Sequence, residues 1–121
     1  MPDTIMLVDD DDIVRKLVSS ALQRAGINVL EASSGYAALE IATSHEGDIH
    51  ALLTDVVMPG MSGPQLAVML KRARPNLKII LMSGHTAEIS VNGYGWKLIQ
   101  KPFRIHHIIG RIQELLNDGA Q

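Results

Sequence analysis

Five short apolar runs, each ending at a break, constrain the fold of this chain more than any other feature. The runs lie at 4–8, 27–31, 50–54, 78–82 and 97–100, and each is too short for a helix. The apolar residues between and after them follow helical spacing at 12–25, 37–42, 63–73 and 105–116. Near-continuous apolar strands separated by helices are typical of a parallel sheet that helices cover on both faces. We therefore expect an α/β fold of three layers with a five-stranded, doubly wound sheet.

The helical patterns differ in regularity. The segment 85–96 carries breakers at Gly93 and Gly95, so only one or two helical turns fit there, and a fourth helix is expected to be short or irregular. The first helix has a continuous apolar pattern, and its whole apolar stripe is expected to face the sheet. That stripe comprises Ile13, Val14, Leu17, Val18, Ala21, Leu22 and Ala25.

The composition narrows the classes of function. At 121 residues the chain has the size of one domain, and its net charge of -2 lacks the basic excess of a nucleic-acid-binding protein. The basic residues Lys71, Arg72 and Arg74 are expected to form a solvated helix face. The absence of cysteine excludes disulfides, thiolate metal sites and thiol catalysis. Neither a signal sequence nor an apolar run of membrane-spanning length is found, so we expect a cytoplasmic protein without a membrane partner.

Polar residues follow the apolar runs at the points where the strands are expected to end. The carboxyl ends of the strands meet at one edge of an open parallel sheet, so these residues are expected to share a site. A lone acid at such a position is more often a cap or turn residue, and capping is the simpler role for Asp11 and Asp12. The residues after the first, third, fourth and fifth runs are, in order, Asp9 with Asp10, Asp55, Ser83 with Gly84, and Lys101.

Three carboxylates gathered at this edge would repel one another. At about 5 Å and an effective dielectric near 20, each pair costs on the order of 3 kcal/mol. Lys101 supplies one positive charge, which does not balance Asp9, Asp10 and Asp55. Oxygen ligands without His or Cys are those that a hard divalent cation prefers, so the residues predict Mg²⁺, with Mn²⁺ as an alternative ion.

Four stretches of the chain resemble the motifs of a known family. They are Leu7–Asp11, Thr54–Gly63, Leu81–Gly84 and Gln100–Phe103. In this order and spacing the chain resembles the receiver domains of two-component response regulators over nearly its whole length. The resemblance implies a flavodoxin-like (βα)5 fold, one receiver domain over residues 1–121 without an output domain, and a phosphoacceptor signalling role rather than that of an enzyme. The last stretch and the short fourth helix are most similar to receivers attached to hybrid histidine kinases.

The resemblance implies a phosphoacceptor and a set of metal ligands. Asp55 matches the residue that takes a phosphoryl group from the phosphohistidine of a histidine kinase or histidine phosphotransfer protein, in a Mg²⁺-dependent reaction. Asp10, Asp55 and the backbone carbonyl of Val57 match direct ligands of the ion, and Asp9 would act mainly through a bound water. The signal would pass to a downstream protein or to an attached kinase domain, and a homodimer is also compatible with the family.

Further positions match the groups that surround the phosphoryl group. Lys101 would pair with its oxygens, and the Ser83 hydroxyl would hydrogen-bond one of them after transfer. Backbone N–H groups near Val57 and Gly84 would cover the remaining oxygens, so that positioning and charge neutralisation carry most of the chemistry. In the family the bond between this lysine and the next residue, here Lys101–Pro102, is commonly cis.

Two features depart from the family pattern: the residue three before the lysine, and the segment from Ser83 to Lys101, which is several residues shorter than usual. Receivers usually carry Tyr or Phe three residues before the lysine, and that ring turns inward when the Ser/Thr hydroxyl, here that of Ser83, is drawn to the phosphate. This chain has Leu98 there, which cannot make the same switch, and the nearby Trp96 and Tyr94 are candidate substitutes. Val57 and His85 occupy the positions that tune hydrolysis of the phosphoryl group. We expect a dry, slowly hydrolysing site with His85 not placed as a base.

Two other functions were weighed against a receiver. A phosphatase of the haloacid-dehalogenase type also uses a strand-end Asp nucleophile with Mg²⁺, but its second acid normally lies two residues further on, where this chain has Val57. A nucleotide- or flavin-binding domain of similar fold would carry a glycine-rich turn after the first strand, where this chain has an acidic run. A receiver domain is therefore the favoured prediction of function.

Overall fold

The computed structural model describes residues 2–84 and 96–118. Its strands are β1 Thr4–Val8, β2 Asn28–Ala32, β3 Ala51–Asp55, β4 Lys78–Ser83 and β5 Lys97–Gln100. The helices it describes are α1 Asp12–Arg24, α2 Gly35–Ser44, α3 Gly63–Ala73 and α5 Ile105–Asp118. These elements match the expected ones with small shifts at their ends. The expected fourth helix lies outside the described residues.

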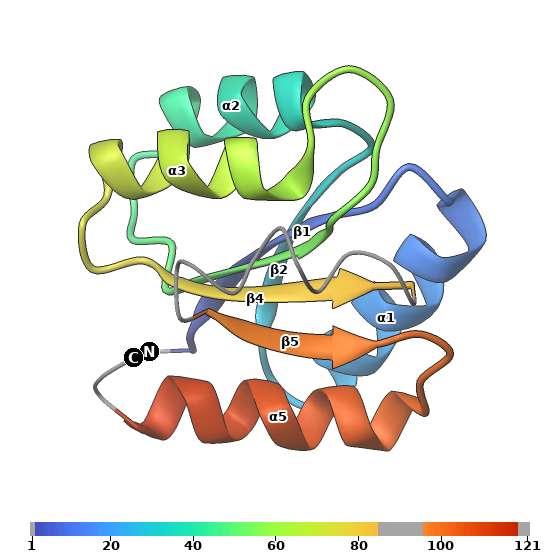
Figure 1. The fold of residues 1–121 in the computed structure, drawn as a ribbon. Coiled ribbons are helices and arrows are strands. Elements are labelled where there is room, and N and C mark those ends of the chain that lie inside the picture. The colour runs from blue at the N-terminus through green and yellow to red at the C-terminus, as the bar shows by residue number, and fades with distance from the viewer. Residues whose placement is uncertain (1, 85–95, 119–121) are drawn as a thin grey trace.

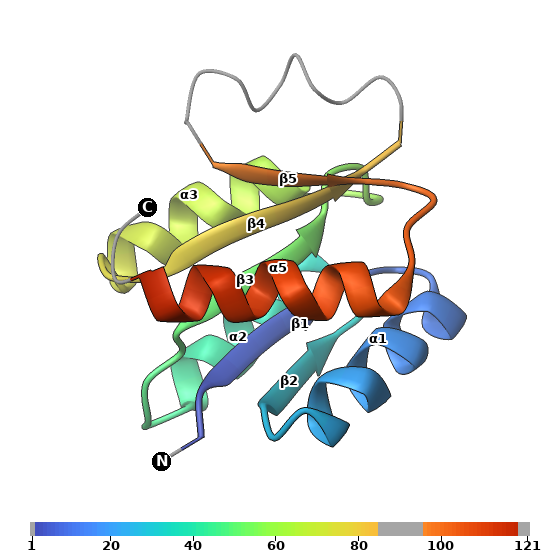
Figure 2. The same ribbon diagram turned by 90° about the horizontal axis from the view of Figure 1, so that it is seen from below.

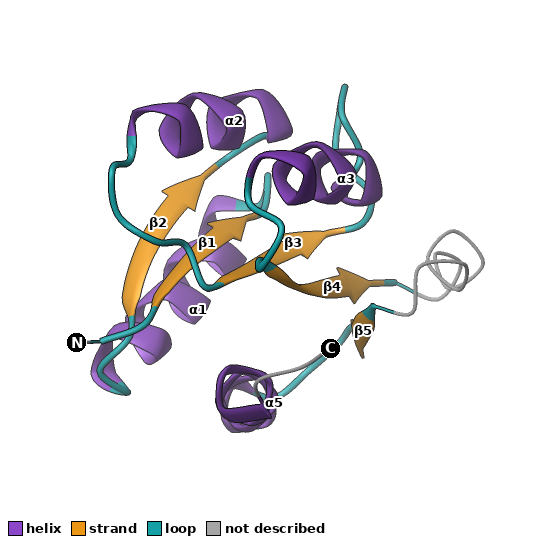
Figure 3. Ribbon diagram, turned by 90° about the vertical axis from the view of Figure 1, so that its left-hand side faces the viewer, coloured by secondary structure: helices purple, strands orange, loops and turns teal. Residues whose placement is uncertain are grey.

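The five strands form one parallel sheet in the order β2-β1-β3-β4-β5. Helices α2 and α3 cover one face, while α1 and α5 cover the other (Figures 1 and 3), which confirms the expected three layers. The chain moves outward from β1 to β2 and then returns to place β3 on the other side of β1. This reversal creates a crevice at the carboxyl ends of β1 and β3, where open α/β sheets place their sites. None of the described helices is long and apolar enough to cross a membrane.

Two hydrophobic clusters hold the layers together, one on each face of the sheet. Successive side chains of a strand point to opposite faces, so Val8 packs with Leu66 beneath α2 and α3, whereas Leu7 packs with Ile112 beneath α1 and α5. All four side chains are fully buried. The central strands β1, β3 and β4 are therefore buried on both sides, and polar groups follow their carboxyl ends.

Helix α1 buries two polar residues, Arg15 and Ser19, that its apolar pattern does not predict to be buried. Val18 and Leu22 are buried as expected, but the prediction is wrong for Ile13 and Leu17, which are 81% and 53% exposed, and for Ala25, which is also exposed. Arg15 is buried instead, because its guanidinium bonds to groups at the sheet edge. Figure 2 shows α1 lying beside α5 on this face, so the sheet contacts only part of the helix surface.

The basic residues at the end of α3 form the expected solvated face only in part: Arg72 is exposed, whereas Lys71 and Arg74 are partly buried. Arg74 caps the end of α2: its Nη2 donates to the carbonyls of Ala42 (3.1 Å) and His45 (3.0 Å), and its Nη1 to that of Gly47 (3.0 Å). These carbonyls are the unpaired acceptors of a helix end and the turn after it. Arg74 therefore ties α2 to α3, and the expectation of a solvated residue is wrong for it.

Replacing Arg74 with Ala is expected to lower the free energy of unfolding by about 1 to 3 kcal/mol, because it leaves several carbonyls without their charged donor. Urea unfolding followed by circular dichroism measures the change. Arg72→Ala is the matched control, since Arg72 is an exposed neighbour and its loss should change stability by no more than about 0.5 kcal/mol. Equal losses in the two variants would contradict this role for Arg74.

Candidate functional site

Strand register brings the predicted polar residues to one edge of the sheet. Val8 pairs with Thr54 and Asp55 with Met82, so β3 extends one residue beyond the end of β1 and places Asp55 next to the β1–α1 loop. On the far side Ser83 pairs with Gln100, which puts Lys101 at the same level. The expectation of a shared edge is therefore confirmed by the geometry.

The carboxylates of Asp9, Asp10 and Asp55 form a compact cluster. One oxygen from each lies within 4.8 Å of the others. Asp9 is completely buried, Asp55 is partly buried and Asp10 is exposed. Asp9 Oδ1 accepts a hydrogen bond from the N–H of Asp11 (2.9 Å), whereas Asp9 Oδ2 has no hydrogen-bond partner among the described residues. This buried oxygen has only a long ion pair with Lys101 (3.5 Å) among the described residues, which leaves it able to bind a further cation or donor.

Lys101 supplies the positive charge at this cluster. Its Nζ lies 3.2 Å from Asp55 Oδ2 and 3.5 Å from Asp9 Oδ2. The backbone N–H of Lys101 donates to the Ser83 carbonyl (2.7 Å), which fixes the base of the side chain to the end of β4. The bond between Lys101 and Pro102 is cis, as the family resemblance implied.

The acids at the start of α1 have separate roles. The Asp11 side chain accepts from the N–H groups of Ile13 (3.0 Å) and Val14 (3.2 Å), so it is the N-cap of the helix. Asp12 lies in the first turn and pairs with Arg15 at 2.7 Å. The expectation that these two acids are structural is confirmed, and only Asp9 and Asp10 of the acidic run join the cluster.

The loop after Asp55 is held tightly at its base. The N–H of Val56 donates to the Met82 carbonyl (2.9 Å). The carbonyl of Val56 accepts from the N–H of Gly63 at the start of α3 (2.9 Å). Val57 follows this anchor and is 70% exposed. The predicted roles of the Val57 carbonyl and N–H remain predictions.

Gly63 makes the closest approach of any described glycine to its surroundings. A Cβ added there would lie 2.1 Å from the carbonyl oxygen of Asp55 and 3.1 Å from Cα of Val56. Both are backbone atoms, which cannot move aside as a flexible side chain can. The start of α3 therefore packs directly against the backbone of Asp55.

The remaining predicted residues differ in their burial and contacts. Ser83 is 1% exposed, and its hydroxyl donates to the Gly84 carbonyl. Leu98 and Trp96 are partly buried and pack against the hydrophobic cluster under α2 and α3. Their predicted parts in switching remain untested, and His85 lies outside the described residues.

Burial and charge raise the pKa of Asp55 above its ordinary value of 3.8. Desolvation is the largest cause, Asp9 and Asp10 add to it, and Lys101 opposes it. Burial lowers the pKa of Lys101, but the attraction of Asp55 and Asp9 outweighs this effect, so the pKa of Lys101 lies above 10.5. Lys101 is therefore a permanent cation at neutral pH, while ionised Asp55 is destabilised in the metal-free protein.

The raised pKa of Asp55 predicts how the stability of the metal-free protein depends on pH. The folded state holds this proton more tightly than the unfolded chain, so the contribution of Asp55 to stability increases as the pH falls through its raised pKa toward 3.8. Asp55→Asn, which carries no charge, is expected to be more stable than wild type at neutral pH, and the difference should shrink as the pH falls. Urea unfolding in EDTA at several pH values measures the difference. A difference that grows toward low pH would contradict the prediction.

The cluster fits a hard divalent cation. Its donors are all oxygens, it carries three carboxylates against one lysine, and Asp9 Oδ2 is buried without a hydrogen bond from the described residues. Partly exposed oxygens of Asp55 and Asp10 leave room for water ligands, which Mg²⁺ usually keeps. These features match Mg²⁺ in the donor type that it prefers.

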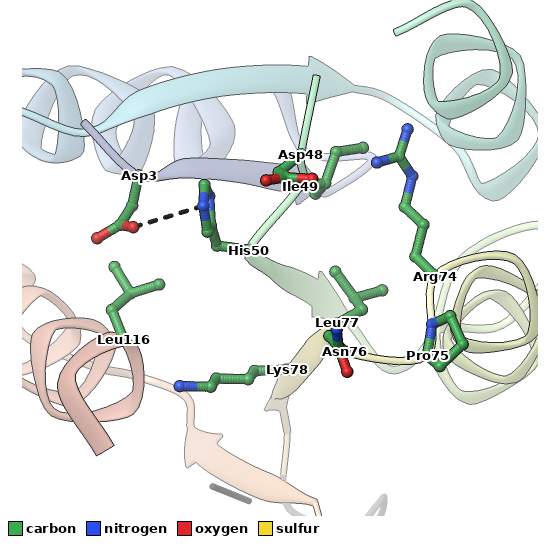
Figure 4. Close-up of a pocket in the computed structure, with 10 residues that line it drawn as sticks. All are labelled: Asp3, Asp48, Ile49, His50, Arg74, Pro75, Asn76, Leu77, Lys78 and Leu116. Atoms are coloured by element: carbon green, nitrogen blue, oxygen red, sulfur yellow. Dashed lines mark ion pairs between the residues drawn. The ribbon is translucent and has the colours of Figure 1, made fainter. Parts of the chain in front are cut away.

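A cavity of about 350 Å³ lies at the opposite edge of the sheet, where the strands begin (Figure 4). Lys78 Nζ donates there to the Leu115 carbonyl (2.8 Å). His50 accepts from the N–H of Thr4 (2.9 Å) and lies 3.7 Å from Asp3. The basic groups of this cavity are thus engaged in joining β1, β3, β4 and α5. His50 is half-buried and holds the backbone at the start of β1.

Two residues that contact the backbone of the site, Arg15 and Gly63, were not among the predicted site residues. Gly63 had only a weak signal: glycine supplies close backbone approaches, but it is also tolerated at helix starts for other reasons. Arg15 had none, because a polar residue in an amphipathic helix is expected to face solvent.

Comparisons with known proteins agree with the fold. The profile of the family described as the response regulator receiver domain matches residues 5–113. The sensor kinase CckA of Brucella abortus is 35% identical over 117 residues, which are 93% of this chain but only 12% of CckA. The response regulator receiver protein CpdR of the same organism is 32% identical over 93% of this chain and 95% of its own length.

A solved structure gives the same result. The response regulator receiver protein from Sinorhizobium medicae WSM419 superposes with a TM-score of 0.86 at 32% identity, covering 98% of this chain and 97% of that one. None of these matches supports a phosphatase of the haloacid-dehalogenase type. The matched sequence profile, the relatives and the doubly wound fold together place the chain in the response regulator receiver domain family, a family of two-component signalling.

Proposed function

We propose that Asp55 accepts the phosphoryl group in this receiver domain. The observation that carries the proposal is the position of its carboxylate at the end of β3, 3.2 Å from Lys101 Nζ and within reach of two further acids. An oxygen of Asp55 attacks the phosphorus of a phosphohistidine. The phosphorus–nitrogen bond breaks, its electron pair returns to the imidazole, and an aspartyl phosphate forms.

Asp9 and Asp10, with Asp55, would hold Mg²⁺, which supplies positive charge against the phosphoryl oxygens. Lys101 is already directed at Asp55 and would pair with an oxygen of the transferred group. Ser83 would have to turn its hydroxyl from the Gly84 carbonyl toward that group. The N–H groups near Val57 and Gly84 complete the proposed contacts, in keeping with a reaction that depends on positioning and charge neutralisation.

The proposed donor is a histidine kinase or a histidine phosphotransfer protein, the partners of this family. The likeness to CckA, a sensor kinase of which the chain spans a small part, supports a receiver attached to a kinase. The likeness to CpdR along almost its whole length supports a receiver that acts by itself. Residues 1–121 are proposed to form the receiver domain alone in either setting. Any slow loss of the phosphoryl group would be self-catalysed hydrolysis within this signalling role.

Incubation with acetyl phosphate and Mg²⁺ tests the proposal. Intact-mass measurement is expected to show a gain of one phosphoryl group, and hydroxylamine should remove it, because hydroxylamine cleaves acyl phosphates but not phosphate esters of serine. EDTA should prevent the gain. A modification that forms equally well in EDTA, or that resists hydroxylamine, would overturn the assignment to a metal-assisted aspartyl phosphate.

A further inference from the structure

The buried guanidinium of Arg15 lies beside the acidic site without contacting its carboxylates. Arg15 Nη1 donates to the backbone carbonyl of Asp9 at 2.8 Å. Its Nη2 pairs with Asp12 at 2.7 Å, and its Nε lies 3.4 Å from Glu31 in β2. All three nitrogens are therefore committed, and the side chain is only 10% exposed.

The contact of Arg15 fixes a peptide group that matters for the metal site. The Asp9 carbonyl belongs to the planar peptide that links Asp9 to Asp10, so holding its oxygen sets the direction in which the chain enters Asp10. On the other side of Asp9, its N–H donates to the Ala32 carbonyl at the end of β2 (3.2 Å). Asp9 is thus clamped at both backbone groups, directly by Ala32 and through Arg15 by Glu31.

The charge of Arg15 is balanced locally. Asp12 and Glu31 supply two carboxylates, and the Glu31 carboxylate also receives a hydrogen bond from Ser19 (3.0 Å) and lies 3.5 Å from Lys16 Nζ. Arg15 therefore does not neutralise the net negative charge of the cluster, which a bound metal ion would balance. It contributes a fixed geometry instead.

We propose that Arg15 is a positioning residue for the metal site: by bonding the Asp9 carbonyl it orients the Asp9–Asp10 pair toward the ion. The inference rests on the proposed function, because that function supplies the ion. Residues that orient ligands in this way are typically worth about 10- to 100-fold in metal affinity. A bystander cation would have the opposite effect, since removing a positive charge near the cluster strengthens cation binding by Coulomb attraction.

The test is the affinity for Mg²⁺, measured by calorimetry with the metal alone and by competition with Mn²⁺ in electron paramagnetic resonance. Arg15→Gln is expected to bind Mg²⁺ about 10-fold more weakly than wild type. Arg15→Lys keeps the charge but has one nitrogen in place of a three-nitrogen fork, so it should also bind more weakly. Arg15→Lys carries the test if Arg15→Gln does not fold. Unchanged or tighter binding in the folded variant would overturn the inference.

Two neighbouring variants separate positioning from charge and from stability. Lys16→Gln removes a positive charge from the exposed side of the same helix, where Lys16 pairs with Glu31, and should leave Mg²⁺ affinity unchanged or slightly tighter. Glu31→Gln weakens the ion pair that joins α1 to β2 but keeps an oxygen that can accept a hydrogen bond from Arg15. We therefore expect it to lower the free energy of unfolding while changing the affinity for Mg²⁺ little. If Glu31→Gln weakened Mg²⁺ binding as much as Arg15→Gln at equal stability, Arg15 would be merely structural.

The wild-type protein distinguishes failure of this inference from failure of the proposed function. Wild type that binds Mg²⁺ and gains a phosphoryl group, together with an Arg15 variant that binds Mg²⁺ equally well, would overturn only the inference. Wild type that does not bind Mg²⁺ would overturn both.

Discussion

Replacing Asp55 with Asn is expected to reduce phosphoryl incorporation from acetyl phosphate to the level of a blank without protein. Asn has nearly the same shape, but its neutral amide is a very weak nucleophile compared with a carboxylate. Asp55 is also the described carboxylate nearest to Lys101, at 3.2 Å, so the substitution removes the attacking oxygen from beside the cation that would stabilise the transferred group. Intact mass after incubation with Mg²⁺, with and without hydroxylamine, measures the loss.

The matched control for Asp55→Asn is Asp48→Asn. Asp48 is an exposed carboxylate that lines the cavity at the opposite edge of the sheet, so this variant should incorporate the phosphoryl group as wild type does. Circular dichroism should show both variants folded, because neither substitution changes side-chain volume appreciably. Full incorporation by Asp55→Asn would place the phosphoryl group on another residue and refute the proposed role of Asp55.

Replacing Gly63 with Ala is expected to cost about 3 kcal/mol or more of unfolding free energy, at the upper end of what overpacking produces. The added methyl carbon would lie 2.1 Å from the Asp55 carbonyl oxygen, so α3 must move away from the end of β3. That movement also strains the hydrogen bond between Gly63 and Val56, which anchors the loop after Asp55. Phosphoryl incorporation should therefore slow as well, even under conditions in which the variant remains folded.

Gly110→Ala is the control for Gly63→Ala because the same substitution should have the opposite sign there. Gly110 lies inside α5, and an added Cβ meets no atom within 4 Å. Alanine in a helix interior is favoured over glycine by roughly 0.5 to 1 kcal/mol, so Gly110→Ala should be more stable than wild type. Urea unfolding of both variants measures the two changes. A loss of less than about 1 kcal/mol in Gly63→Ala would show that α3 accommodates the methyl group.

The fold of the described residues could be predicted from the sequence because its strands and helices have clear local signals. The run before Asp55 is too apolar for a surface and too short for a helix, and a Pro-Gly break follows it. Five such runs separated by helices permit few topologies, since parallel strands need crossover connections. The same reasoning predicts that Asp9, Asp55 and Lys101 lie at one edge of the sheet, because all three follow the carboxyl ends of strands.

The local signals were insufficient where a side chain depends on a distant segment. The apolar stripe of α1 predicted that Ile13 and Leu17 would be buried, yet the sheet covers only part of the helix and both are exposed. Arg74 reads as a charged helix end, but the chain brings it to the carbonyls at the end of α2. Periodicity gives the direction of a side chain around its own helix, and it does not give the groups that the fold brings to it.

The sequence by itself determined which residues end the strands, and hence the cluster of Asp9, Asp10 and Asp55 with Lys101. This part is local, because a strand end and the residue after it are neighbours along the chain. Only the tertiary structure decided that Asp9 is the buried member of the cluster, that Arg15 holds its carbonyl, and that Gly63 touches the backbone of Asp55. Each of these depends on the distance between packed elements, which is set by the filling of the whole core rather than by any one segment.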